Sequence, residues 1–96
     1  MRVSFNASAI ADLREIFSYI AADDKNAAIM LIGRICEAVM RIGECPGVGQ
    51  WIEAGQLKKL PIGNYTLFYE VQTGEIIIHH VRHGARLLPW ENRERN

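Results

Sequence analysis

The sequence predicts an α+β fold in which a helical hairpin packs on a small antiparallel sheet, in the order β-α-α-β-β-β. Two long segments carry apolar residues at helical spacing and are separated only by the short polar stretch 23–26. After them, the turn signals Gly63-Asn64 and Thr73-Gly74 separate runs that are rich in β-branched and aromatic residues. Two successive hairpins of this kind form a three-stranded meander, and the helices would bury their apolar faces against it.

The first 22 residues predict a short strand and then a helix. Residues 2–5 alternate between polar and apolar side chains, as in a half-buried strand. Asn6 follows, and asparagine is a preferred N-cap because its side chain accepts a hydrogen bond from an early helical amide. From about Ala7 to Ala22, one apolar stripe recurs at spacings of three and four: Ile10, Leu13, Ile16, Phe17 and Ile20.

The next segment predicts a second helix of nearly five turns. Either Asp23 or Asp24 is suited to cap it. The helical period is carried by Ala28, Leu31, Ile32, Ile35, Val39 and Ile42. Because the loop between the helices is so short, we expect them to pack as an antiparallel hairpin. The run 45–49, which holds a proline and two glycines, then ends the helical region.

Residues 51–55 predict a loop, and three strands follow over 57–62, 65–72 and 75–82. Pro61 lies near the end of the first of these strands, where its missing N–H does least harm. The other two strands contain apolar residues at both odd and even positions. We therefore expect them to be covered, in part, on both faces.

Length and composition indicate a single domain over residues 1–96, in which the charged tail 91–96 is expected to be frayed. Hydrophobic residues make up 49% of the chain and charged residues 23%, which excludes a disordered protein. No apolar run approaches the roughly 20 residues that a membrane span needs. The first residues lack the apolar core of a signal peptide, so the expected location is the cytoplasm.

Neither the charges nor the cysteines indicate a metal or a cofactor, and we predict none. The net charge is zero, although residues 54–96 hold six of the 11 Lys/Arg, four of the 11 Asp/Glu and all three histidines. Such a basic end can form a local anion-binding face. Cys36 and Cys45 do not have metal-ligand spacing, and Cys36 is expected to be a buried free thiol.

Four stretches, in the right order, resemble the RelE/ParE superfamily of bacterial type II toxin–antitoxin toxins, also called plasmid-stabilisation proteins. They are residues 11–16 with 19–21 (ADLREI and YIA), 45–49 (CPGVG), 60–69 (LPIGNYTLFY) and 83–86 (HGAR). The resemblance covers nearly the whole chain and implies a small toxin that a cognate antitoxin, usually encoded beside it, neutralises. RelE-like members cleave messenger RNA in the ribosomal A site, whereas ParE-like members poison DNA gyrase. Whether the chain is an enzyme depends on which branch it follows.

Under the RelE-like alternative the chain would be a ribosome-dependent endoribonuclease. The resemblance then assigns the catalytic set to Lys58, Lys59, His83 and Arg86. His83 is suited to proton transfer because the pKa of histidine lies near neutrality. However, Thr66 stands where RelE-like sequences have arginine, and their late tyrosine is missing here. These two departures remove a phosphate-stabilising guanidinium and a proton-transfer group, so they argue against an efficient ribonuclease.

The favoured alternative is ParE-like, in which the toxin inhibits DNA gyrase by binding and has no catalytic set. Because arginine and tryptophan are enriched at interface hot spots, the predicted target-binding residues are Arg82, His83, Arg86 and Trp90. The resemblance implies a hetero-oligomer with a ParD-like antitoxin, whose arm would cover part of the first helix and the basic sheet end. The residues predicted to bind that arm are Leu13, Phe17 and Tyr19. A third alternative is a degenerate toxin that is retained for antitoxin binding or operon regulation.

Overall fold

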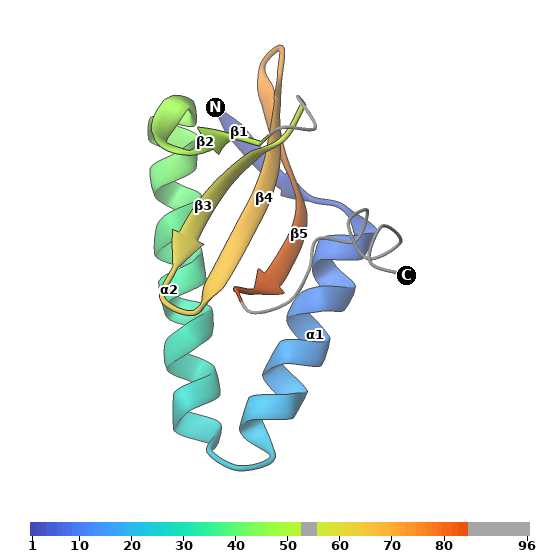
Figure 1. Cartoon of the computed structure of the whole chain (residues 1–96), viewed down its shortest axis with the longest axis vertical. Coiled ribbons are helices and arrows are strands. Elements are labelled where there is room, and N and C mark those ends of the chain that lie inside the picture. Colours follow the sequence, from blue (N-terminus) through green and yellow to red (C-terminus); the bar gives the residue numbers. More distant parts are fainter. Residues whose placement is uncertain (53–55, 85–96) are drawn as a thin grey trace.

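The computed structural model describes residues 1–52 and 56–84, and it contains the predicted helices and strands with one short strand in addition (Figure 1). The elements are β1 (Arg2–Phe5), α1 (Ala7–Ala21), α2 (Lys25–Glu44), the 3₁₀ helix η1 (Pro46–Val48), β2 (Gln50–Trp51), β3 (Lys58–Ile62), β4 (Tyr65–Gln72) and β5 (Glu75–His83). The predicted α+β class and the helical hairpin are therefore confirmed.

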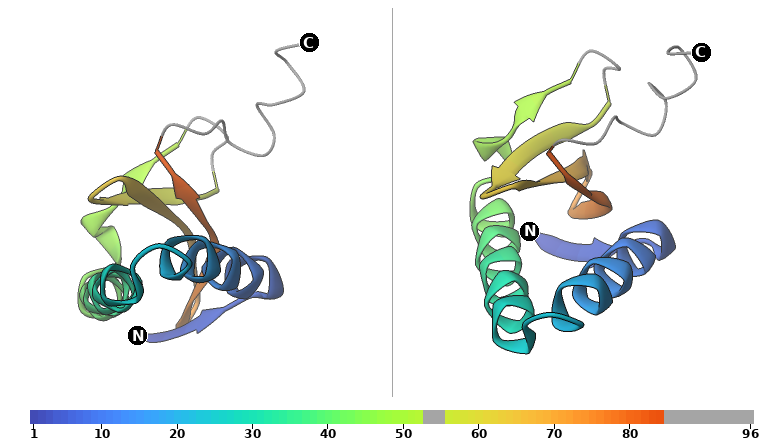
Figure 2. Two further views of the ribbon diagram at one scale, coloured as in Figure 1. Left: turned by 90° about the horizontal axis from the view of Figure 1, so that it is seen from below. Right: turned by 60° about the horizontal axis from the view of Figure 1, so that its bottom comes forward.

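Both helices begin at a capping side chain. The Asn6 Oδ1 atom accepts a hydrogen bond from the backbone N–H of Ala9 at 2.9 Å. Asp24, rather than Asp23, caps α2 by accepting from the backbone N–H of Ala27 at 3.1 Å. Only residues 22–24 separate the helices, and Figure 2 shows both of them on the same side of β3, β4 and β5.

The strands form one mixed sheet in the order β1-β5-β4-β3-β2. The predicted meander is present, because β3, β4 and β5 pair antiparallel through the predicted turns. By contrast, β1 runs parallel to β5, with pairs from Arg2–Glu75 to Phe5–Ile78. The sheet is therefore not wholly antiparallel as predicted. The difference arises because β5, the last strand of the meander, lies beside β1 and runs in the same direction.

The short strand β2 is not among the predicted strands, and its second residue, Trp51, falls in the predicted loop 51–55. Its two residues pair antiparallel with β3, Gln50 with Lys59 and Trp51 with Lys58. The Trp51 side chain is 62% exposed, and the Lys58 ammonium lies 4.2 Å from the centre of its ring. A strand of two residues leaves no alternation in the sequence, which is why the pattern did not reveal it.

The core lies between the helices and the inner face of the sheet. Its buried side chains are Ala9, Ile35, Ala38, Ile42, Leu60, Ile62, Leu67, Tyr69, Ile76, Ile78 and Val81. Along β3, β4 and the first half of β5 they occupy every second position, as the pleat of a strand requires. The helices contribute mainly small or β-branched residues, which lets them approach the sheet closely.

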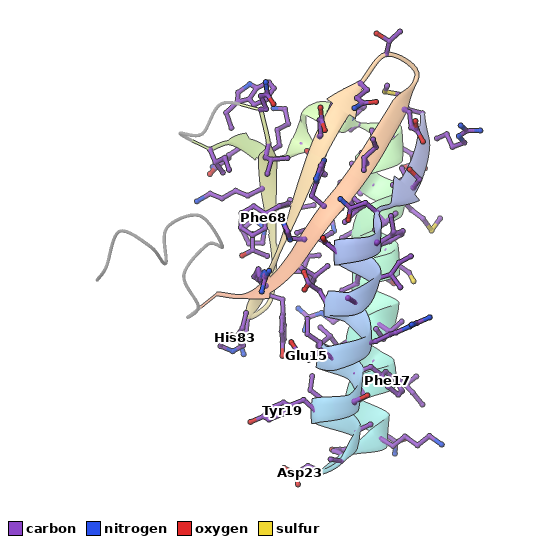
Figure 3. The ribbon with its side chains drawn as sticks, turned by 90° about the vertical axis from the view of Figure 1, so that its right-hand side faces the viewer. Glu15, Phe17, Tyr19, Asp23, Phe68 and His83 are labelled. Carbon is purple, nitrogen blue, oxygen red and sulfur yellow. The ribbon has the colours of Figure 1, made fainter. Side chains whose placement is uncertain are left out.

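A β-bulge interrupts this alternation in the middle of β5. Tyr69 of β4 pairs with Ile78 and Phe68 pairs with His80, so His79 is the extra residue. The bulge returns Val81 to the core although it lies three positions after Ile78. Phe68 points to the opposite face (Figure 3) and is only 3% exposed, which confirms for β4 the predicted cover on both faces.

The hydroxyl group of Tyr69 connects the sheet to the break after α2. It donates a hydrogen bond to the carbonyl oxygen of Pro46 and accepts one from the N–H of Gly49, both at 2.8 Å. Burial raises the pKa of this hydroxyl. A Cβ atom on Gly49 would lie 2.5 Å from the Tyr69 oxygen and 2.7 Å from the carbonyl oxygen of Lys59. Glycine is therefore required at position 49 by the close approach of the Tyr69 side chain and the β3 backbone.

Two expectations about single residues have a clear outcome. Cys36 was expected to be buried, but it is exposed, because it lies on the face of α2 opposite Ile35, Ala38 and Ile42. Gly63, in the first turn of the meander, has a φ of 58°, a conformation that glycine adopts without strain.

Neither helix in residues 1–52 and 56–84 is long and apolar enough to cross a membrane.

Candidate interaction site

A cavity of about 430 Å³ lies between α1 and the end of the sheet where β4 begins and β5 ends. Figure 3 shows Glu15 and Tyr19 projecting from α1 on the side where His83 ends β5. The cavity is lined by Asp12, Glu15, Ile16, Tyr19, Tyr65, Val81, Arg82 and His83. An apolar floor with aromatic and charged groups around it is typical of a site that binds another molecule.

The α1 wall of the cavity follows from helical spacing. Glu15 and Ile16 lie three and four residues after Asp12, and Tyr19 lies four and three residues after them, so all four share one face of the helix. Ile16 packs against the core, whereas Tyr19, less than one turn further on, is 81% exposed. The helix thus changes from packed to open along this face, which gives the cavity a wide mouth.

Beyond the end of β1, the Asp12 side chain takes the place of a strand partner for β5. β1 pairs with β5 as far as Ile78, and the N–H of Val81 then donates a hydrogen bond to the Asp12 Oδ2 atom at 3.0 Å. The same oxygen lies 3.8 Å from Nε of Arg82 and 3.7 Å from Nδ1 of His80. Both nitrogen atoms are buried and have no hydrogen-bond partner within the described residues. Asp12 therefore acts on them through its charge rather than through hydrogen bonds.

The charge of Asp12 balances that of Arg82. Burial lowers the pKa of His80, the nearby guanidinium of Arg82 lowers it further, and the Asp12 carboxylate acts in the opposite direction. His80 is consequently neutral at neutral pH. That leaves one carboxylate and one guanidinium as the ion pair at the base of the cavity.

Aromatic rings form the wall on the sheet side. Tyr65 and His83 are cross-strand partners, and their ring centres are 5.2 Å apart at an angle of 86°, an edge-to-face arrangement. Val81, on the same strand as His83, forms part of the floor. The cavity therefore has tyrosine side chains on both walls, Tyr19 from α1 and Tyr65 from β4.

A second polar cluster lies along β5, outside the cavity. Nε2 of His79 lies 2.9 Å from Oε1 of Glu70, and Nδ1 of His79 lies 3.1 Å from Nδ2 of Asn6. Because Asn6 uses its oxygen to cap α1, its amide nitrogen faces the ring and donates to Nδ1. Nε2–H then donates to Glu70, and this hydrogen bond lowers the pKa of that carboxyl group. The cluster joins the extra residue of the bulge to the start of α1, which is a structural role.

The RelE-like catalytic set does not converge where the structure describes it. Lys58 pairs with Tyr69 and Lys59 with the next residue, Phe68, so their side chains point to opposite faces of β3. The Lys58 ammonium lies beside the residue that precedes β2, 3.4 Å from the carbonyl oxygen of Gly49. His83 pairs with Tyr65, which precedes Phe68 and Tyr69 in β4 by three and four residues. At the usual rise of a strand, His83 is therefore about 10–13 Å along the sheet from the two lysines.

The residues predicted to bind partners are placed differently from one another. Leu13 packs against the core, and Phe17 is partly buried and projects from α1 (Figure 3). Tyr19 is exposed, and with Arg82 and His83 it lines the cavity. Arg86 and Trp90 lie outside the described residues. The roles of all these residues in binding stay predictions.

Five residues that line the cavity are not among the predicted site residues: Asp12, Glu15, Ile16, Tyr65 and Val81. Tyr65 begins β4, whereas Asp12, Glu15 and Ile16 lie on α1. Their spacing with Tyr19 on one helical face was the available signal. Its meaning depended on β5 lying against that face, which periodicity does not reveal. Within the described residues, no three His, Cys, Asp or Glu side chains are placed to hold a metal ion together.

The same fold is found in a solved structure. A solved structure titled "Chromosomal ParDE TA system from P. aeruginosa" contains a chain with the same fold, at a TM-score of 0.76 and 22% sequence identity. The similarity covers 86% of this chain and 95% of that one. A search of curated proteins found no match.

The family follows from the sequence as a whole. The model of the family "ParE toxin of type II toxin-antitoxin system, parDE" matches residues 3–88. The chain belongs to this family of toxins, which confirms the resemblance to the ParE branch.

Proposed function

We propose that this ParE-family toxin inhibits DNA gyrase by binding it, and that a ParD-like antitoxin prevents this by occupying the cavity between α1 and β5. The observation that carries the proposal is the exposed Tyr19 at the mouth of a cavity with an apolar floor. An exposed aromatic side chain beside an apolar depression is typical of an interface hot spot. The structural neighbour is part of a ParDE toxin–antitoxin system, which supports an antitoxin as the partner.

The arrangement of the basic residues supports binding rather than RNA cleavage. General acid–base catalysis needs its groups within hydrogen-bond reach of one reacting phosphate. Lys58, Lys59 and His83 are spread over two faces and several residues of strand length. Arg82, which we place in the target-binding surface with His83, Arg86 and Trp90, is held beside Asp12. A positioned guanidinium of this kind suits recognition of a protein surface.

A paired assay of the purified toxin tests the target. One reaction contains gyrase, relaxed DNA and ATP, and the other contains ribosomes programmed with messenger RNA. We expect loss of supercoiling or trapped cleaved DNA in the first, and intact message in the second. Cut message with active gyrase would overturn the proposal in favour of the RelE-like alternative. If neither reaction changes, the degenerate toxin is the better description.

A binding experiment tests the antitoxin site. The antitoxin encoded beside the toxin gene is titrated into wild-type toxin, the variant Tyr19→Ala and the control Met30→Ala, whose residue is also exposed but lies on α2. Removing a hot-spot aromatic should weaken binding about tenfold or more, whereas the control should bind as wild type. Equal binding by both variants would show that the cavity is not the antitoxin site.

A further inference from the structure

We infer that the cavity between α1 and β5 accepts a cationic side chain, arginine or lysine, from the protein that docks there. This inference extends the proposed function. It depends on the proposed function only for naming the antitoxin as the partner. The cationic nature of the occupant follows from the charges and rings of the cavity itself.

The charges of the cavity do not cancel. Asp12 and Arg82 form one ion pair, with Oδ2 and Nε 3.8 Å apart. Asp12 is further committed to the N–H of Val81. Glu15, also on α1, is exposed and makes no hydrogen bond or ion pair within the described residues. The side chains that line the cavity therefore leave one carboxylate unbalanced, and this favours a positive group on the occupant.

The rings around Glu15 favour the same occupant. Figure 3 shows the side chains of Glu15 and Tyr19 projecting from α1 on the side where His83 lies, and all three residues line the cavity. Tyr65 stands opposite, on β4. A cation is attracted to the face of a tyrosine ring, and a guanidinium stacks on it as well. The same preference is already satisfied once in this protein, where the Lys58 ammonium lies over Trp51.

The floor explains how such a side chain would be held. Ile16 and Val81 are apolar, so they suit the aliphatic stem of a long basic side chain while its charged end reaches Glu15. A phosphate or carboxylate group in the cavity would be repelled by the Glu15 carboxylate. A nucleic-acid backbone is therefore disfavoured at this cavity, and a basic segment of a protein is favoured.

A small-probe titration tests the inference without the antitoxin or gyrase. The full-length chain, labelled with ¹⁵N, is titrated with N-acetyl-arginine N-methylamide and, separately, with the citrulline analogue, which has nearly the same shape and no charge. The amide signals of Glu15, Tyr19 and Val81 report on the cavity. We expect arginine to shift these signals and to bind about threefold or more tightly than citrulline, the range of an exposed ion pair.

The variant Glu15→Gln keeps the shape of the side chain and removes its charge. It should bring the affinity for the arginine probe down to that for citrulline, whereas Glu37→Gln, on α2 and outside the cavity, should leave it unchanged. Equal binding of arginine and citrulline by wild type, shifts confined to another surface, or equal affinity in the two variants would each overturn the inference. Because no antitoxin is present, such a failure leaves the proposed function standing. Conversely, arginine binding combined with failure of the antitoxin to bind would overturn the proposed function alone.

Discussion

Two regions of this molecule use tyrosine in opposite ways. Near η1, the Tyr69 ring is fully buried and its hydroxyl joins two backbone groups of the Pro46–Gly49 run. At the cavity, the Tyr19 ring is exposed beside apolar floor residues. In the first region every polar atom of the side chain is used inside the fold. In the second, the ring remains available to a partner, so the fold should tolerate its change.

The largest expected effect lies in the η1 region. Gly49→Ala should lower the free energy of unfolding by about 3 kcal/mol, because the new methyl group would collide with the Tyr69 hydroxyl and with the backbone of Lys59. Urea unfolding measures the change. Gly47→Ala is the matched control, since a Cβ atom there meets nothing within 4 Å. If the two variants are equally stable, the close approach at Gly49 does not matter to the fold.

A smaller loss is expected when only the hydroxyl is removed. Tyr69→Phe leaves the N–H of Gly49 and the carbonyl of Pro46 without their partner, which should lower the free energy of unfolding by about 2 kcal/mol. Thermal unfolding at fixed pH would detect it. A variant as stable as wild type would mean that water replaces the hydroxyl without loss, and the comparison between the two regions would weaken.

The base of the cavity should respond to pH through His80. Its pKa is lowered in the folded protein, so the unfolded chain binds more protons once the pH falls below about 6.5, the ordinary value for histidine. Stability is therefore complete above that pH and decreases as the pH falls toward the folded pKa. Urea unfolding at several pH values between 7.5 and 5 should show this decrease, and His80→Gln should reduce it. An identical slope in the variant, or an NMR titration of the His80 ring at or above 6.5, would contradict the prediction.

The smallest effect on stability is expected at the cavity mouth. Tyr19→Phe makes the same chemical change as Tyr69→Phe, but at an exposed position, so its free energy of unfolding should lie within about 0.5 kcal/mol of wild type. The two variants, measured side by side under one condition, compare the regions directly. A loss at Tyr19 as large as that at Tyr69 would place Tyr19 in the structural core and remove the reason for treating it as a contact residue.

The local features of the fold could be predicted because each is written in neighbouring residues. The apolar stripe of α1 and the Asn6 cap required nothing beyond one segment. The turn at Gly63 was equally local, because the positive φ there is one that glycine adopts easily. The order of elements followed from these features together with chain length.

Features that depend on distant segments could not be predicted in the same way. The parallel pairing of β1 with β5 and the bulge at His79 arise from tertiary packing. The hydrogen bond of Asp12 to Val81 spans 69 residues of sequence. Asp12 carries no mark that distinguishes it from an ordinary solvated aspartate, so the cavity could not be recognised before the strands were in place.

That long separation also sets the order of events during synthesis. The ribosome adds about 5–20 residues per second, so roughly 3–14 s pass between the making of Asp12 and of Val81. During this interval α1 has no β5 beside it, and the cavity does not exist. A partner that recognises the cavity can bind only after β5 has been made. If the antitoxin binds this cavity as proposed, neutralisation can begin only once β5 has been made, and antitoxin that is already present can bind as soon as the cavity forms.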